Sequence, residues 1–338
     1  MAKKSLIGLS VAEIAGIIGP AGFNIKHSVS VAQSIYKKGI TDIRLINKIP
    51  NKLKEMMNEY FSTGVFPPVE SELSADGTIK YLFRTSDGRF FESVFIPDKK
   101  RNTVCVSSQA GCRMGCSFCV TARYGYHGDL SAGEIVNQVI SIPGADKVTH
   151  VVLMGMGEPM DNLDNVLKAC DILTSEWGLS LSPKNITVST VGITPGIEKF
   201  LAVSKCNLAL SLFSPFQEER KALIPAEAKY PVKSILKLLK DYPVRKNRRL
   251  SLAYVMIQDL NDTDRHLSEL KELLNDSGIR VNLLPFHSTG KDSFTSSSPE
   301  RMLYFKHNLV VSGISASIRK SRGLDISAAC GLLAAGLK

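Results

Sequence analysis

Between residue 103 and the C-terminus, short apolar runs typical of buried strands alternate regularly with helical patterns. Strands that are separated by helices run parallel and are joined by right-handed crossovers. Six or more such units in succession predict an α/β fold, a partial (β/α)6 barrel, with a doubly wound open sheet as the alternative. Both arrangements place functional side chains at the carboxyl ends of the strands. The expected strands lie at 103–109, 149–154, 185–191, 206–212, 249–257, 281–286 and 315–320, and the expected helices begin near 131, 161, 195, 231, 263 and 298.

The N-terminal part of the chain has a different pattern. Residues 1–75 show helical periodicity and no catalytic motif, with helices expected from Ser10 and over 29–38 and 49–62. Ser10-x-x-Glu13 is a capping box, which favours a helix over a secretory signal peptide for the apolar stretch behind the first lysines. We therefore expect a small helical accessory domain.

A third pattern separates this domain from the alternating region. Two β-rich runs between residues 79 and 96 flank Ser86-Asp87-Gly88, a tripeptide typical of hairpin turns. They predict a β-hairpin extension over residues 76–100. The remaining residues, 101–338, are expected to form the core domain.

Composition excludes two classes of protein. With 44% hydrophobic and 22% charged residues, the chain has the apolar content of a globular protein rather than a disordered one. Charged residues such as Glu13 and Lys26 interrupt the apolar runs before they reach the length of a membrane span. We expect no membrane association.

The charge of the chain suggests a polyanionic partner. The formal net charge is +10, and three short segments concentrate the basic residues. For any one of these clusters, a solvated loop is the alternative explanation. The clusters are Lys99, Lys100 and Arg101; Arg245, Lys246, Arg248 and Arg249; and Arg319, Lys320 and Arg322.

The cysteines point to a metal centre in a reducing compartment, and we expect a cytoplasmic protein. Seven cysteines are an odd number, and a disulfide framework does not explain three of them within eight residues. Cys112-x3-Cys116-x2-Cys119 presents three thiolates, which select soft metals, from one loop. Zinc needs a fourth ligand, for which His127 is the candidate. Three close cysteines alone can hold a [4Fe–4S] cluster with one iron open to a further ligand.

This cysteine spacing, with Phe118 before the last cysteine, resembles the signature of radical S-adenosylmethionine (radical SAM) enzymes. The resemblance implies a TIM-type partial barrel in which the open iron binds SAM. It also implies a donor such as flavodoxin or ferredoxin, whose electron cleaves SAM to a 5′-deoxyadenosyl radical. Met154–Met160 (MGMGEPM) resembles the segment of these enzymes that meets the SAM amino group. Gly157 permits close approach there, and the Glu158 carboxylate accepts from the amino group.

Two further segments resemble the adenosine methyltransferases of the RlmN and Cfr types. Glu92–Cys112 is similar to the stretch that joins their Glu-x-Val and Cys-x-Ser-Ser-Gln motifs, and Ile318–Leu333 to their C-terminal loop with its lone cysteine. The resemblance implies that one SAM methylates Cys330 and that a second SAM supplies the radical that abstracts hydrogen from this methyl group. The carbon radical then adds to adenine. Cys105 assists proton loss and closes a disulfide with Cys330, while Glu92 matches the proton acceptor.

Four more positions match places where these enzymes contact SAM. Ser189 and Ser211 keep the family residues, whereas Phe213 replaces a histidine and His287 replaces an asparagine. His287 can donate the hydrogen bond that Phe213 cannot, which suggests a compensating exchange across the site.

The resemblance implies methylation of adenosine C2 in 23S rRNA and, for some members, in tRNA. Arg319-Lys320-x-Arg322-Gly323 resembles the C2 enzymes, whereas Ser-Pro-Phe at 214–216 and Lys229-Tyr230-Pro231 favour C8 methylation as the alternative. A third hypothesis, motivated by Phe213 and His287, is a non-catalytic iron–sulfur protein that binds RNA. In each case we expect the accessory domain to contact RNA phosphates.

Overall fold

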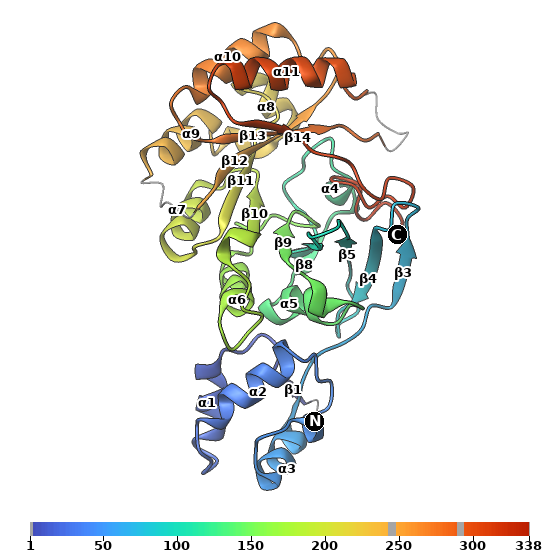
Figure 1. The fold of residues 1–338 in the computed structure, drawn as a ribbon, viewed down its shortest axis with the longest axis vertical. Helices are drawn as coiled ribbons and strands as arrows, with labels where there is room; N and C mark the ends of the chain where they lie inside the picture. The colour runs from blue at the N-terminus through green and yellow to red at the C-terminus, as the bar shows by residue number, and fades with distance from the viewer. Residues whose placement is uncertain (1–2, 243–247, 289–293, 338) are drawn as a thin grey trace.

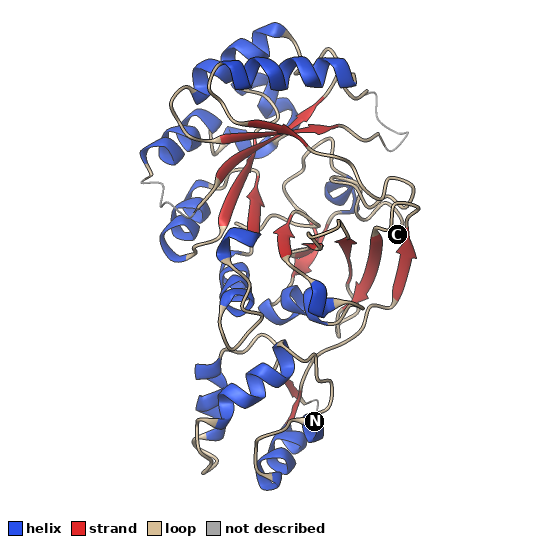
Figure 2. Ribbon diagram, in the orientation of Figure 1, coloured by secondary structure: helices blue, strands red, loops and turns tan. Residues whose placement is uncertain are grey.

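A ten-stranded sheet forms the framework of the molecule (Figures 1 and 2). The computed structural model describes residues 3–242, 248–288 and 294–337; Arg245 and Lys246 of the second basic cluster lie outside them. Seven neighbouring strands of this sheet are parallel, and their spatial order follows the chain order without a reversal. A doubly wound sheet requires a reversal, so the partial barrel is confirmed and the open-sheet alternative is wrong. The seven strands are β6 (Thr103–Val106), β9 (His150–Leu153), β10 (Ile186–Thr190), β11 (Asn207–Ser211), β12 (Leu250–Met256), β13 (Arg280–Pro285) and β14 (Ala316–Ile318).

The predicted helices between these strands are confirmed. The helices lie on the outer side of the curved sheet, and the C-terminal segment lies near α4 (Val120–Tyr124) on the other side (Figure 1). The short α8 (Gln217–Leu223) and α4 were not predicted, because one or two turns produce too little periodicity. The predicted helices are α5 (Ala132–Ile140), α6 (Leu163–Thr174), α7 (Thr194–Val203), α9 (Val232–Asp241), α10 (Asp264–Leu274) and α11 (Pro299–Val311).

The two faces of the parallel strands carry different side chains. Apolar residues such as Val188, Leu208 and Leu252 are buried on the face towards the helices. Bulky branched residues usually fill the inside of a closed barrel. In this open barrel the inner face is mainly small or polar, which leaves room for ligands. Its residues include Thr187, Ser189, Asn207, Ser211, Ser251, Ala253 and Asn282.

The predicted hairpin is present and extends the same sheet. β4 (Ile79–Arg84) pairs with β5 (Phe90–Ile96), and β5 runs antiparallel to β6. β3 (Glu70–Leu73), which the sequence did not predict, pairs with β4 at the edge. The hairpin therefore flanks the inner side of the barrel and carries Glu92 next to β6.

The N-terminal helices form a separate group at one end of the molecule (Figure 1). They are α1 (Val11–Ile18), α2 (His27–Tyr36) and α3 (Asn51–Tyr60). The predicted capping box is confirmed, since the Ser10 hydroxyl accepts from the Glu13 amide at 3.2 Å and the Glu13 carboxylate accepts from the Ser10 amide at 2.7 Å. Among the described residues, no helix is long and apolar enough to cross a membrane.

The C-terminal segment after β14 is tied to the turn between β3 and β4. The Asp325 carboxylate accepts from the Ser74 hydroxyl at 2.6 Å and from the Ala75 amide at 3.0 Å. The Gly323 amide donates to the Asp76 carboxylate at 3.0 Å. The turn between β3 and β4 thus anchors the beginning of the segment that carries Cys330.

We predict that Asp325→Ala will loosen this anchor. The Ala75 amide loses its acceptor, so its hydrogen exchange should accelerate several-fold, and the segment after residue 319 should become more sensitive to protease. Asp164→Ala, which removes a largely exposed carboxylate on α6, is the control and should leave both unchanged. Unaltered exchange at Ala75 in Asp325→Ala would contradict the anchor.

Candidate active site

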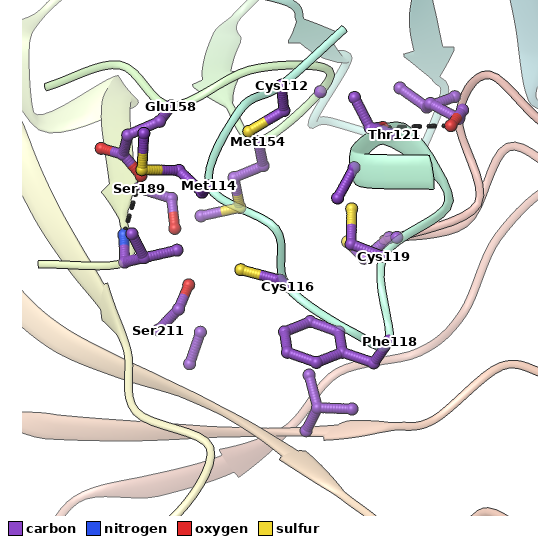
Figure 3. A pocket seen from close by; sticks show the side chains of 18 of the residues that line it. Cys112, Met114, Cys116, Phe118, Cys119, Thr121, Met154, Glu158, Ser189 and Ser211 are labelled. Atoms are coloured by element: carbon purple, nitrogen blue, oxygen red, sulfur yellow. Dashed lines mark hydrogen bonds between the residues drawn. The ribbon is translucent and has the colours of Figure 1, made fainter. Parts of the chain in front are cut away.

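The loop between β7 (Gln109–Gly111) and α4 carries the three cysteines of the metal motif. All three line one pocket, and Figure 3 shows the sulfur atoms of Cys112 and Cys116 pointing towards its open centre. The loop turns sharply at Gly111, where φ is +83° and a Cβ atom would lie 1.7 Å from the Gly125 carbonyl oxygen. The Cys112 amide donates to that carbonyl at 2.8 Å. Only glycine fits this position, so the local backbone fixes where the first cysteine lies.

The chemistry of the loop fits an iron–sulfur cluster. Burial raises the pKa of the Cys112 thiol to about 12 and also raises the pKa of Cys116, so these thiols bind as thiolates only with a compensating cation. Within the described ranges, no three His, Cys, Asp or Glu side chains form a group suited to a metal ion. His127 contacts the Tyr124 carbonyl oxygen instead, with its Nε2 at 3.1 Å, and does not line the pocket. His127 therefore does not supply the fourth ligand that zinc requires, whereas three thiolates suit a [4Fe–4S] cluster with one open iron.

Gly157 and Glu158 form the next wall of the pocket, after β9. Gly157 has φ +100°, and a Cβ atom there would lie 2.6 Å from Cβ of Gln109. The buried Glu158 carboxylate accepts from the Met160 amide and the Val191 amide, both at 2.9 Å. It therefore ties the loops after β9 and β10 together. Burial raises the pKa of Glu158 to about 7 despite these hydrogen bonds.

The predicted serines and His287 complete the pocket. Figure 3 shows Ser189 of β10 and Ser211 of β11 opposite Cys116. Both serines and His287 line the pocket. The His287 ring Nε2 lies 2.7 Å from the hydroxyl of Ser321, a residue of the third basic cluster segment. Burial lowers the pKa of His287, which favours its neutral form at pH 7.

Phe213 lies behind the cysteine loop and does not line the pocket. It is buried and its ring stacks on Phe118 with centroids 4.0 Å apart. Its backbone has φ +68°, an uncommon conformation for a bulky residue. The Asn261 side-chain amide holds it there by donating to the Phe213 carbonyl at 2.7 Å. The structure thus places this residue where it supports the loop between Cys116 and Cys119.

The three residues expected to act on the methyl group lie together at the C-terminal segment. Cys330 is on the pocket wall. Cys105 of β6 is buried nearby, and its pKa is raised by burial and then by the Cys330 sulfur. The Glu92 carboxylate accepts from the Ala334 amide at 2.7 Å, and its other oxygen lies 3.4 Å from Nζ of Lys80. Cys105 and Glu92 are not among the residues that line the pocket itself.

Sequence reasoning missed a buried ion pair beneath this site. The Arg220 side chain pairs with Glu227, and both are fully buried. The guanidinium also donates to the carbonyls of Leu212 at 2.9 Å and Ser211 at 3.1 Å, and to that of Val191. It therefore holds the loops after β10 and β11. Nothing in the charged segment QEERKAL distinguishes this arginine from those of a solvated helix.

Comparisons with known proteins agree with this site. The sequence profile of the Radical SAM superfamily matches residues 106–274. Proteins named "Probable dual-specificity RNA methyltransferase RlmN" from Parabacteroides distasonis and Bacteroides thetaiotaomicron are 42% and 43% identical, over 98% of this chain and 96% of theirs. The crystal structure of a radical SAM methyltransferase from Sphaerobacter thermophilus is 35% identical, with a TM-score of 0.92 over 98% of this chain and 99% of that one.

The partial barrel and its three-cysteine loop define a radical SAM enzyme, which uses a [4Fe–4S] cluster and SAM. More narrowly, the chain belongs to the RlmN family of RNA methyltransferases. The family resemblance is thereby confirmed. The zinc site and the non-catalytic iron–sulfur protein are set aside.

Replacing Glu158 should change how stability depends on pH. Because the pKa of Glu158 is raised from 4.5 to about 7, the folded protein keeps a proton that the unfolded chain releases. The free energy of unfolding of the wild type should therefore fall relative to Glu158→Gln as the pH rises from 4.5 to about 7, and the difference should then level off. Urea unfolding of the apoprotein across this range measures it. A difference that does not vary with pH would contradict the raised pKa.

Arg220→Met should destabilise the apoprotein by about 3–5 kcal/mol, because it leaves the Glu227 carboxylate buried without its partner. Arg220→Met/Glu227→Gln should recover part of this loss, since the uncompensated charge is gone. Urea unfolding compares the two variants. Equal stability of the single and double variants would show that the charge pairing is unimportant.

Proposed function

We propose that this enzyme methylates C2 of an adenosine in 23S rRNA, and also in tRNA, with Cys330 as the methyl carrier. The observation that carries the proposal is the position of Cys330, which shares the pocket wall with the cluster cysteines and lies beside the buried Cys105. A methyl carrier must reach both the SAM site and the substrate base, and a side chain on this wall meets the first requirement. Family membership supports the RNA substrate.

The residues of the chain have distinct tasks in this proposal. Cys112, Cys116 and Cys119 hold the cluster, and Gly157, Glu158, Ser189, Ser211 and His287 form the SAM site. When bound, the cluster and SAM supply a one-electron cleavage that produces a 5′-deoxyadenosyl radical. Phe213 supports the cluster loop from behind.

Cys330 accepts the methyl group of one SAM and later loses one hydrogen atom from it, so that the resulting carbon radical bonds to adenine. The adduct carries one unpaired electron, which the oxidised cluster would take up when bound, while Cys105 assists loss of the C2 proton. The Cys105 thiolate then forms a disulfide with Cys330 as the carbon–sulfur bond to the product breaks, and the released carbon takes up a proton to complete the methyl group. Burial raises the pKa of the Cys105 thiol, which suits a group that must take up and hold a proton. We assign Glu92 as the final proton acceptor, supported by its contact with Ala334 of the same segment.

The preference for C2 over C8 rests on Arg319-Lys320-x-Arg322-Gly323, which lies in the segment that leads to Cys330. Ser214 of the Ser-Pro-Phe sequence, which favours C8, instead donates from its hydroxyl to Glu219 at 2.7 Å and is not a pocket residue. Reduction requires a donor such as flavodoxin or ferredoxin. A reducing cytoplasm fits both that donor and free cysteines.

The two cysteines should fail in different ways. Cys330→Ala removes the methyl carrier, so neither methylated protein nor methylated RNA should form. Cys105→Ala should still be methylated on Cys330 and should accumulate a covalent protein–RNA adduct, because the adduct cannot be resolved. Denaturing gels with and without nuclease measure the adduct, and mass spectrometry of digested RNA distinguishes C2 from C8 methyladenosine.

The double variant Cys105→Ala/Cys330→Ala is the control and should form no adduct. Normal turnover by Cys105→Ala would remove this residue from the mechanism. An 8-methyladenosine product would replace the proposed C2 specificity by the C8 alternative.

A further inference from the structure

Four arginines from distant parts of the chain lie along the inner face of the barrel. Arg101 precedes β6, Arg249 precedes β12, Arg280 begins β13 and Arg319 follows β14. Three of them come from the three basic clusters of the sequence, one from each. The curvature of the sheet thus gathers segments that are separate in the chain.

Strand register places Arg249 and Arg280 on this inner face. Side chains alternate along a strand, and Arg249 lies on the same face as Ala253, which lines the pocket. Arg280 pairs with Ser251 of the neighbouring strand and lies on the same face as the pocket residue Leu284. Paired residues of neighbouring strands share a face, so these two arginines lie on one surface of β12 and β13.

Arg319 continues this surface towards the active site. Its Nε donates to the Asn282 side-chain oxygen at 3.1 Å, and the Ser317 hydroxyl donates to the same oxygen at 3.0 Å. Asn282 lies two residues beyond Arg280 on the inner face. Two residues further on, the Ser321 hydroxyl lies 2.7 Å from Nε2 of His287, which lines the pocket together with Cys330. The row therefore runs from the amino ends of the strands towards the pocket.

The four positive charges interact with one another. The pKa of Arg319 is lowered mainly by reduced solvation and further by repulsion from Arg101 and Arg249. The pKa of Arg249 is also lowered by reduced solvation, and by repulsion from Arg280 and Arg101. Among the residues that the structure describes, no carboxylate forms an ion pair with any of the four. Such a concentration of unpaired like charge is unfavourable unless an anion binds there.

We propose that Arg101, Arg249, Arg280 and Arg319 form a phosphodiester-binding row that holds the RNA strand beside the target adenosine. This inference rests on the proposed function, in which the base reaches Cys330. Guanidinium groups bind phosphate oxygens in a bidentate manner. The hydroxyl of Ser317 and the amide of Asn282 lie along the same row, where groups that can contact a 2′-hydroxyl are useful. An acidic electron-donor protein is disfavoured, because the row lies on a concave inner face that leads to the methyl carrier.

Arg249→Gln/Arg280→Gln tests the row at the end away from Cys330. Binding of a fluorescent RNA hairpin to the cluster-loaded enzyme is measured by anisotropy over a salt series. We expect the affinity to fall about 10- to 100-fold and the slope of log K against log salt to decrease by about 2, because each lost phosphate contact releases about one counterion fewer. Lys237→Gln/Lys306→Gln removes the same charge from exposed positions on the outer helices α9 and α11 and should change the affinity less than about 2-fold.

Three further readouts separate the possible failures. Arg249→Lys/Arg280→Lys should keep the salt slope and lose part of the affinity, since charge remains but bidentate geometry does not. Methylation of Cys330 and cleavage of SAM with a chemical reductant should be unchanged in all these arginine variants. Absence of Cys330 methylation in the wild type would overturn the proposed function, while RNA binding could still be measured.

Unchanged RNA affinity and an unchanged salt slope in Arg249→Gln/Arg280→Gln would overturn the proposed arginine row. If flavodoxin-dependent reduction is lost at the same time, the arginines dock an acidic electron donor instead.

Discussion

Hydrogen bonds between the C-terminal segment and the first residues of α4, directly after the cysteine loop, are the interactions on which the active site depends. The Val120 amide donates to the Gly331 carbonyl at 2.9 Å, and the Thr121 hydroxyl donates to the Leu333 carbonyl at 3.0 Å. These bonds attach the neighbours of Cys330 to the helix that begins directly after Cys119. A segment more than 200 positions away in sequence is thereby fixed relative to the three-cysteine loop. Because the partners are main-chain groups or a hydroxyl, the attachment does not change with pH near neutrality.

The open barrel supplies the second requirement, which is space. A closed barrel would fill its interior with branched side chains, whereas here the curved sheet ends at β14 on one side and at the hairpin edge on the other. Small residues such as Ser189, Ser211 and Ala253 therefore face a cavity without the cost of an empty core. The buried Glu158 and Arg220 keep that cavity in shape by joining the loops after successive strands. At the strand ends, polar contacts therefore hold neighbouring loops together, whereas apolar packing holds the rest of the core together.

Much of the architecture could be predicted from sequence because its causes are local. The alternation of apolar strand patterns with helical patterns predicted the parallel strands, and the Cys112-x3-Cys116-x2-Cys119 spacing predicted the loop whose three cysteines line the pocket. The pocket also contains Gly157 and Glu158, which follow a predicted strand, and Ser189 and Ser211, which the family resemblance implied. The burial of Arg220 against three carbonyls and the proximity of arginines from three basic clusters could not be predicted. The first depends on which carbonyls come together and the second on how far the sheet curves, and no single segment encodes either.

Phe213 and His287 illustrate why a substitution cannot be interpreted without the fold. From sequence they suggested one exchange across the SAM site, in which a histidine moves to the opposite wall. The structure gives them different surroundings. Phe213 packs against Phe118 behind the cysteine loop, while His287 contacts Ser321, which lies in the C-terminal segment before Cys330. The buried ring at position 213 packs behind the loop, and the imidazole at 287, whose pKa is lowered by burial, links the pocket to the segment that carries Cys330. The two residues thus act on the cluster loop and on the C-terminal segment separately, and only His287 is positioned to contact a ligand in the pocket.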